Sequence, residues 1–195
     1  RIESRGLGDV YKRQVPGRLT AWKGHEMFIQ SLNLVKIELG YDAFHAVILG
    51  NEQGRDLYKK KLMQLTEQYH LTNQIKFIDH CKDMALAYKI SDIVISPSIE
   101  PEAFGRVAVE AQSMEKLIIA SNIGGSNETI IDGKTGLLFE AGDPNSLSKR
   151  IIQAVTLDES SYKRMGKEGR KNIAKKFNVE KMCFSTYSEY KRLLN

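Results

Sequence analysis

Short apolar runs that alternate with helical patterns constrain the fold of this chain more than any other feature of its sequence. Each run ends in turn or polar residues, and we predict four buried strands, at residues 44–50, 75–78, 92–96 and 117–120. Apolar residues between them recur at helical spacing, most clearly over residues 28–39. This alternation predicts an α/β fold, with a Rossmann-like parallel sheet and flanking helices.

The first residues of the chain show neither helical nor strand periodicity. Residues 1–14 have no apolar segment and no small-residue cleavage site, so they are not a signal peptide. Their string GLGDVYKRQ resembles a translated sequencing-adapter read-through. We therefore expect a leader that is foreign to the fold, or alternatively a disordered native leader, followed by residues 15–19 as the remnant of a first strand.

The last third of the chain is helical in pattern. Asp143 and Pro144 form a favoured N-cap and N1 pair, a basic helix follows at residues 160–177, and another helix covers residues 179–194. We expect one domain, residues 15–178, followed by a separate C-terminal helix, residues 179–195.

Charge and cysteine content exclude several classes of protein. The net charge is +5, but the 29 Lys and Arg residues are scattered among 24 Asp and Glu residues, so we expect no nucleic-acid partner. No apolar run approaches the roughly 18 residues of a membrane span. The two cysteines and four histidines show no ligand spacing, which favours a reducing compartment and no structural metal.

The loop after the predicted strand at residues 92–96 is the most informative segment. Two prolines end the strand, and Gly105 precedes a helical stripe. The amides near Phe104, Gly105 and Arg106 then form a helix N-terminus, which binds anions and above all phosphate.

Glu102 and Glu110 flank this N-terminus, and at helical rise their carboxylates lie up to roughly 12 Å apart. Carboxylates accept hydrogen bonds from vicinal hydroxyls and are poor neighbours for phosphate. The pair therefore suits the two ends of a nucleotide sugar. By itself, such a spacing more often belongs to two solvated acids that the helix dipole favours.

Two further loops also follow predicted strands. Arg18 and Lys23 leave one strand-to-helix loop and can converge on a diphosphate, although a lone basic pair is more often a solvated loop. The Gly-rich residues 121–128 and 132–136 are equally compatible with a ligand loop and with two ordinary turns.

Together and in this order, the three clusters resemble the C-terminal half of a retaining glycosyltransferase of the GT4 type, which has the GT-B fold. The motifs read RLTAWKG, PSIEPEAFGRVAVEA and ASNIGGSNETIIDGKTGLL, and the resemblance covers residues 15 to about 178.

The resemblance implies a nucleotide-sugar donor site without a required metal or other cofactor. It gives a catalytic role to Arg18 and Lys23, on the diphosphate, and to Glu102, on the transferred sugar. Glu110 would bind the ribose hydroxyls, and the loops after the second and third strands would flank the base. The donor-binding residues are then Gly17, Gly50, Asn51, Asp79, His80, Ala103, Phe104, Gly105, Arg106 and Glu110.

Four positions depart from the family pattern. Glu115 and Leu117 stand where the family usually has Gly and Pro, and we interpret this as a local change of turn. Asn127 replaces a frequent Pro, and Asp79 replaces a glycine usual in the loop beside the base.

The resemblance also implies an absent N-terminal domain that binds a glycan or lipid acceptor. The helix at residues 179–194 would cross to that domain, and this half alone would be inactive. We expect a cytoplasmic location, with the basic helix either touching the inner face of the membrane or simply solvated. The alternatives are a nucleotide-sugar epimerase of the same fold and a non-catalytic nucleotide-binding module.

Overall fold

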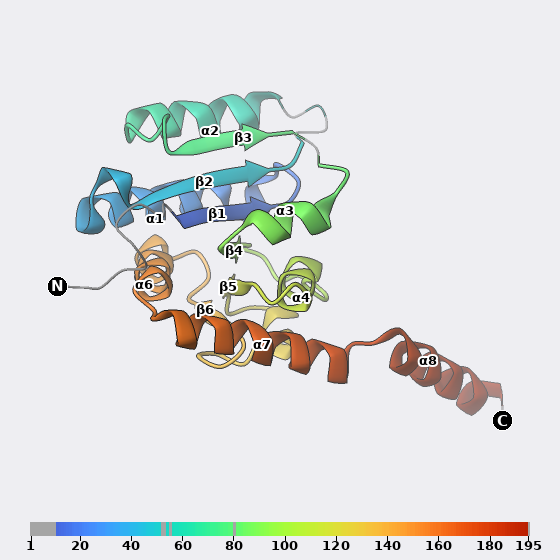
Figure 1. The fold of residues 1–195 in the computed structure, drawn as a ribbon. Coiled ribbons are helices and arrows are strands. Elements are labelled where there is room, and N and C mark those ends of the chain that lie inside the picture. Colours follow the sequence, from blue (N-terminus) through green and yellow to red (C-terminus); the bar gives the residue numbers. More distant parts are fainter. Residues whose placement is uncertain (1–10, 52–53, 55, 80, 195) are drawn as a thin grey trace.

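The computed structural model describes residues 11–194 except 52–53, 55 and 80. Its centre is a six-stranded parallel sheet in the order β3-β2-β1-β4-β5-β6 (Figure 1). The strands are β1 (Tyr11–Pro16), β2 (Phe44–Leu49), β3 (Ile75–Ile78), β4 (Ile93–Ser96), β5 (Leu117–Ser121) and β6 (Leu137–Phe139).

Helices connect the strands and follow the last one. The α-helices are α1 (His25–Leu39), α2 (Asp56–Gln68), α3 (Met84–Ile90), α4 (Arg106–Ser113), α5 (Ser126–Thr129), α6 (Pro144–Val155), α7 (Glu159–Lys176) and α8 (Val179–Leu194). Two short 3-10 helices, η1 (Ala21–Lys23) and η2 (Tyr41–Ala43), precede α1 and β2. The four predicted strands are confirmed to within one residue at either end, whereas β6 has only three residues and was not expected.

Both faces of the sheet are covered, which explains why β4 and β5 are almost continuously apolar. Successive side chains of a strand point to opposite faces. Ile93 and Ile95 accordingly join the larger hydrophobic cluster, with residues of α1 and α6. Val94 joins the smaller cluster, with residues of α3 and α4. This arrangement confirms the predicted Rossmann-like α/β fold.

The expected boundary between leader and domain at Val15 is wrong, because β1 begins at Tyr11. The strand pairs with β2 from Tyr11 onward and with β4 at Arg13 and Gln14. Arg13 and Gln14 are buried although their side chains are polar. The Arg13 guanidinium lies 4.9 Å from the centre of the Phe44 ring, and Gln14 accepts a hydrogen bond from the Ser91 hydroxyl. The first strand, expected at residues 15–19, therefore begins four residues earlier, in a segment with polar side chains. Residues 1–10 lie outside the described part of the chain.

The turn after α4 keeps a left-handed geometry despite its glutamate. Glu115 has a φ of 56°. Its amide donates to the Gln112 carbonyl, and the Lys116 amide donates to the Ala111 carbonyl. This is the Schellman motif that usually carries glycine. Glu115 thus occupies the left-handed position at which glycine is usual in such a turn.

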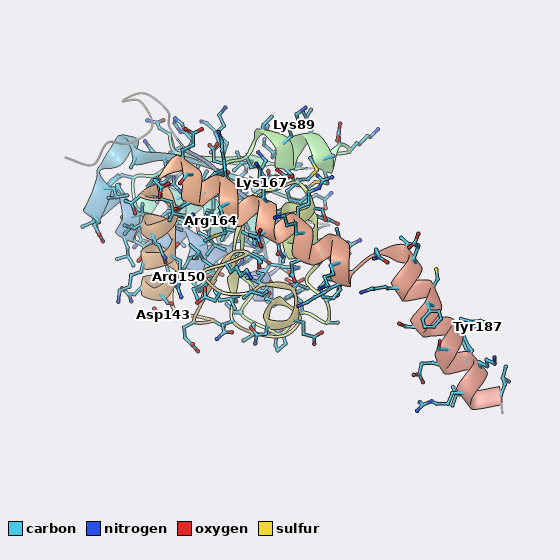
Figure 2. All side chains as sticks on the ribbon, turned by 60° about the horizontal axis from the view of Figure 1, so that its bottom comes forward. Lys89, Asp143, Arg150, Arg164, Lys167 and Tyr187 are labelled. Atoms are coloured by element: carbon cyan, nitrogen blue, oxygen red, sulfur yellow. The ribbon has the colours of Figure 1, made fainter. Side chains whose placement is uncertain are left out.

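The C-terminal helices begin close to their predicted residues. The Asp143 carboxylate accepts a hydrogen bond from the Asn145 amide, as expected for the N-cap of α6. Helix α7 begins one residue before its predicted start, and α8 has its predicted bounds. Helix α8 extends away from the sheet, and Tyr187 lies far from the body of the domain (Figure 2). None of the helices in the described ranges has the length and apolar character of a membrane span.

Candidate donor-binding site

Residues of the loops that follow β1, β2, β3 and β4 line two cavities, at the edge where open α/β sheets bind ligands. One has a volume of about 310 Å³ and the other of about 620 Å³. They share Gly17, Arg18, Arg106, Val107 and Glu110, so they form one continuous candidate site.

The structure brings the predicted site residues together around these cavities. The smaller cavity is also lined by Lys23, Glu102, Ala103, Phe104 and Gly105, and the larger one by Gly50, Asn51 and Asp79. His80 lies outside the described residues. The individual roles of all these residues stay predictions.

Lys23 and Glu102, assigned from the sequence to diphosphate and sugar, form an ion pair with each other. Lys23 Nζ lies 2.7 Å from Glu102 Oε1, and the two side chains are only 13% and 17% exposed. The Ser98 hydroxyl donates to the same carboxylate oxygen. Lys23 Nζ also lies 4.4 Å from the centre of the Trp22 ring. Neither Ser98 nor Trp22 was assigned to the site from the sequence.

The loop that carries Lys23 rests directly on the loop that follows β4. Gly24 is the N-cap of α1 and has a φ of 71°. A Cβ atom at this position would lie 1.8 Å from the Pro97 carbonyl oxygen. Next to it, the Ile99 amide donates to the Trp22 carbonyl over 2.8 Å. This contact between two backbones brings Lys23 to Glu102.

The turn at Gly124 and Gly125 supports the Glu102 loop from the other side. The Gly125 amide donates to the Glu102 carbonyl over 2.8 Å, and a Cβ atom on Gly125 would lie 2.6 Å from the Phe104 carbonyl carbon. Residues 121–128 line neither cavity. Of the two sequence interpretations, the structure therefore favours a packing turn over a ligand loop.

Helix α4 begins between the two glutamates. Gly105 is its N-cap, with a φ of 74°. The Ala108 amide donates to the Gly105 carbonyl, whereas the amides of Arg106 and Val107 have no acceptor within the helix. Arg106 and Val107, the first two helical residues, line both cavities. An anion between Glu102 and Glu110 would meet these amides and the positive end of the helix dipole.

Glu110 is held by a residue that the sequence analysis missed. The Tyr88 hydroxyl donates to Glu110 Oε2 over 2.7 Å, and Tyr88 is 2% exposed. Burial raises the pKa of Tyr88, and the hydrogen bond and charge of Glu110 raise it further, so the hydroxyl stays protonated. In the loop after β3, Asp79 forms an ion pair with Lys59 of α2.

The Phe104 side chain points toward the end of α7. Its ring meets the Phe177 ring edge to face, with centroids 5.5 Å apart. It also lines a cavity of about 910 Å³ with residues 176–182 and 184–185. Phe104 thus connects the loop between β4 and α4 to the α7–α8 junction.

His25, which follows the Lys23 loop, makes the stability of the fold depend on pH. It is fully buried, and burial lowers its pKa to about 4, with the Thr20 backbone opposing and the Lys23 charge adding to the shift. The unfolded chain binds this proton from about pH 6.5. We expect the free energy of unfolding to fall by about 3 kcal/mol between pH 6.5 and pH 4 from this residue alone.

Urea unfolding at several pH values tests this expectation. His25→Leu should remove that part of the pH dependence, whereas His45→Gln, at an exposed position, should retain it. An unchanged pH profile in His25→Leu would show that other groups cause the dependence.

Within the described ranges, no three His, Cys, Asp or Glu side chains gather where they could hold a metal ion. The expectation that no metal is required stays a prediction.

The family of the chain follows from its sequence as well as from this geometry. The model of the family described as "Glycosyl transferases group 1" matches residues 14–172. The chain belongs to this family. Its fold is that of the C-terminal half of a GT-B glycosyltransferase, as the sequence motifs predicted.

Relatives of known name and structure extend this assignment. The chain is 28% identical over 188 residues to the capsular polysaccharide biosynthesis glycosyltransferase CapM of Staphylococcus aureus, covering 96% of this chain and 48% of CapM. A glycosyltransferase structure from Rickettsia africae matches with a TM-score of 0.89 and 32% identity, covering 96% of this chain and 49% of that one. The Anabaena protein Alr3699/HepE in complex with UDP and glucose matches with a TM-score of 0.86 and 25% identity, covering 96% and 50%. The chain thus spans about half of each of these proteins.

Proposed function

We propose that this chain carries the donor site of a retaining glycosyltransferase, which transfers a sugar from a nucleotide-diphosphate sugar to a glycan or lipid acceptor. The observation that carries the proposal is the Lys23–Glu102 ion pair, beside the N-terminus of α4 and in a cavity that continues to Glu110. UDP and glucose in the complex of Alr3699/HepE support a nucleotide-sugar ligand.

The donor is proposed to lie along the continuous site. Its sugar would contact Glu102 in the smaller cavity, and its diphosphate would lie between Arg18, Lys23 and the first amides of α4. The ribose would contact Glu110, and the base would lie in the larger cavity. This order alternates carboxylates for hydroxyl groups with cations and amides for phosphate, as the chemistry of each part requires.

The proposed chemical contribution of this half is electrostatic. When the bond between the sugar C1 and the diphosphate oxygen breaks, negative charge develops on the leaving diphosphate. Arg18, Lys23 and the α4 amides would stabilise that charge, and the helix backbone holds the α4 amides in place before the reaction. Glu102 would orient the sugar hydroxyls, and we assign it no nucleophilic role.

The rest of the reaction belongs to the part of the enzyme outside this chain. Acceptor binding and turnover would need the other half, with which α8 would make contact. The role of CapM in capsular polysaccharide biosynthesis supports an acceptor in an envelope polysaccharide. A cytoplasmic location, with the basic side of α7 near the inner face of the membrane, completes the proposal.

Isothermal titration tests the donor site directly. UDP, GDP, ADP and their sugar conjugates are titrated into the chain and into its Glu110→Ala and Lys23→Ala variants. We expect saturable binding of one nucleotide, weakened at least tenfold in both variants. Lys61→Ala is the matched control, because Lys61 pairs with Glu26 and lines neither cavity. Absence of binding to all three nucleotides would contradict the proposal for this chain.

A further inference from the structure

Glu110 and Tyr88 form a pair at the wall of the larger cavity. Tyr88 comes from α3 and Glu110 from α4, and both line the cavity. The Tyr88 ring belongs to the smaller hydrophobic cluster, beside Val94, Ala108 and Ile118. Two helices and the sheet therefore fix the position of its hydroxyl group.

The two oxygens of the Glu110 carboxylate differ in their hydrogen bonds. Oε2 of Glu110 accepts from the Tyr88 hydroxyl, while Oε1 makes no hydrogen bond with any residue in the described ranges. A carboxylate on a three-bond side chain otherwise samples several rotamers, and ordering it on binding costs free energy. The Tyr88 hydroxyl removes part of that cost beforehand.

We propose that Tyr88 is a positioning residue, which holds the Glu110 carboxylate in the orientation that accepts the ribose hydroxyls of the donor. This inference rests on the proposed function and adds a residue that its motifs do not contain. The same arrangement recurs at the sugar end of the site, where the Ser98 hydroxyl donates to Oε1 of Glu102.

A positioning role predicts an effect that depends on the ribose hydroxyls. In Tyr88→Phe the ring stays and only the hydroxyl is lost, so the hydrophobic cluster keeps its volume. We expect affinity for the bound nucleotide to fall about fivefold, which is the usual effect of one hydrogen bond, and affinity for its 2′,3′-dideoxy form to stay unchanged. A merely structural role would weaken both ligands equally.

The test measures dissociation constants of UDP, GDP and ADP and of their 2′,3′-dideoxy forms. The proteins are the wild-type chain, Tyr88→Phe, Glu110→Gln and the double variant. The preference for ribose over dideoxyribose should fall about fivefold in Tyr88→Phe. Adding Tyr88→Phe to Glu110→Gln should not change that preference further, because the two groups act as one unit. Tyr58→Phe is the control, because Tyr58 is partly buried in α2 and lines neither cavity.

Each outcome of the titrations has a distinct meaning. Equal weakening of ribose and dideoxyribose ligands in Tyr88→Phe would overturn the positioning role, and so would unchanged binding of both. An unchanged preference in Glu110→Gln would overturn the ribose contact of Glu110. Failure of the wild-type chain to bind any nucleotide would overturn the proposed function itself, and thermal unfolding of each variant separates these results from loss of fold.

Discussion

The Gly24→Ala substitution is expected to destabilise the fold by about 2–5 kcal/mol and to abolish nucleotide binding. A left-handed φ of 71° costs alanine about 1–2 kcal/mol. The added Cβ would lie 1.8 Å from the Pro97 carbonyl oxygen, and backbone has to move to relieve such a contact, at a further cost of about 1–3 kcal/mol. That movement should separate the loops of Lys23 and Glu102, so we expect the proposed donor site to be lost along with stability.

Gly133→Ala provides a matched control for the backbone conformation. Gly133 has the same φ of 71°, but a Cβ atom there would have no heavy atom within 4 Å. We expect this variant to lose about 1–2 kcal/mol and to bind nucleotides normally. Urea unfolding and nucleotide titration of both variants separate the effect of backbone strain from the effect of the steric contact with Pro97. Equal losses of stability in the two variants would show that Gly24 acts only through its conformation.

The parts of the fold that the sequence predicted are those with a local signal. Strands β4 and β5 are buried on both faces, so they read as uninterrupted apolar runs between turn residues. The start of α6 has its own cap, Asp143 followed by Pro144. The bounds of α8 follow from its periodicity, although its apolar side chains, such as Tyr187 and Leu193, stay exposed in this chain.

The start of β1 could not be predicted, because nothing local identifies it. Its partners β2 and β4 lie far along the chain, and backbone pairing imposes no side-chain pattern of its own. Arg13 and Gln14 are nevertheless buried, since the strand lies in the middle of the sheet. Tertiary context here overrides the preference of polar residues for the surface.

The candidate site also contains residues that have a local sequence signal and residues that have none. Motifs with fixed spacing identified Arg18, Lys23, Glu102 and Glu110, and the fold brings all four to one pair of cavities. Tyr88 was missed because its hydrogen bond to Glu110 crosses from α3 to α4, with no spacing rule to reveal it. Partners that orient a ligand-binding side chain commonly come from another element, and only the structure shows which they are.

Lys23→Ala is expected to lower kcat of the complete enzyme that contains this half by about 10²–10³. In the proposed reaction, the positive charge of Lys23 would stabilise the diphosphate more strongly as negative charge develops on it during bond cleavage. The loss should therefore be larger in kcat than in the affinity for the donor. The substitution also removes the ion pair. Among the residues that the structure describes, the mostly buried Glu102 carboxylate then keeps the Ser98 hydroxyl as its side-chain partner.

Two further variants decide how Lys23 acts. Lys23→Arg keeps the charge, but a guanidinium differs in shape from the ammonium that lies close to Glu102 and to the Trp22 ring. If charge alone matters, Lys23→Arg should recover most of the lost kcat; if the compact ammonium matters, it should resemble Lys23→Ala. Lys61→Ala, outside both cavities, should turn over at the wild-type rate. A normal kcat in Lys23→Ala would contradict the role of Lys23 on the leaving diphosphate, because no other lysine lines the smaller cavity in the described part of the chain.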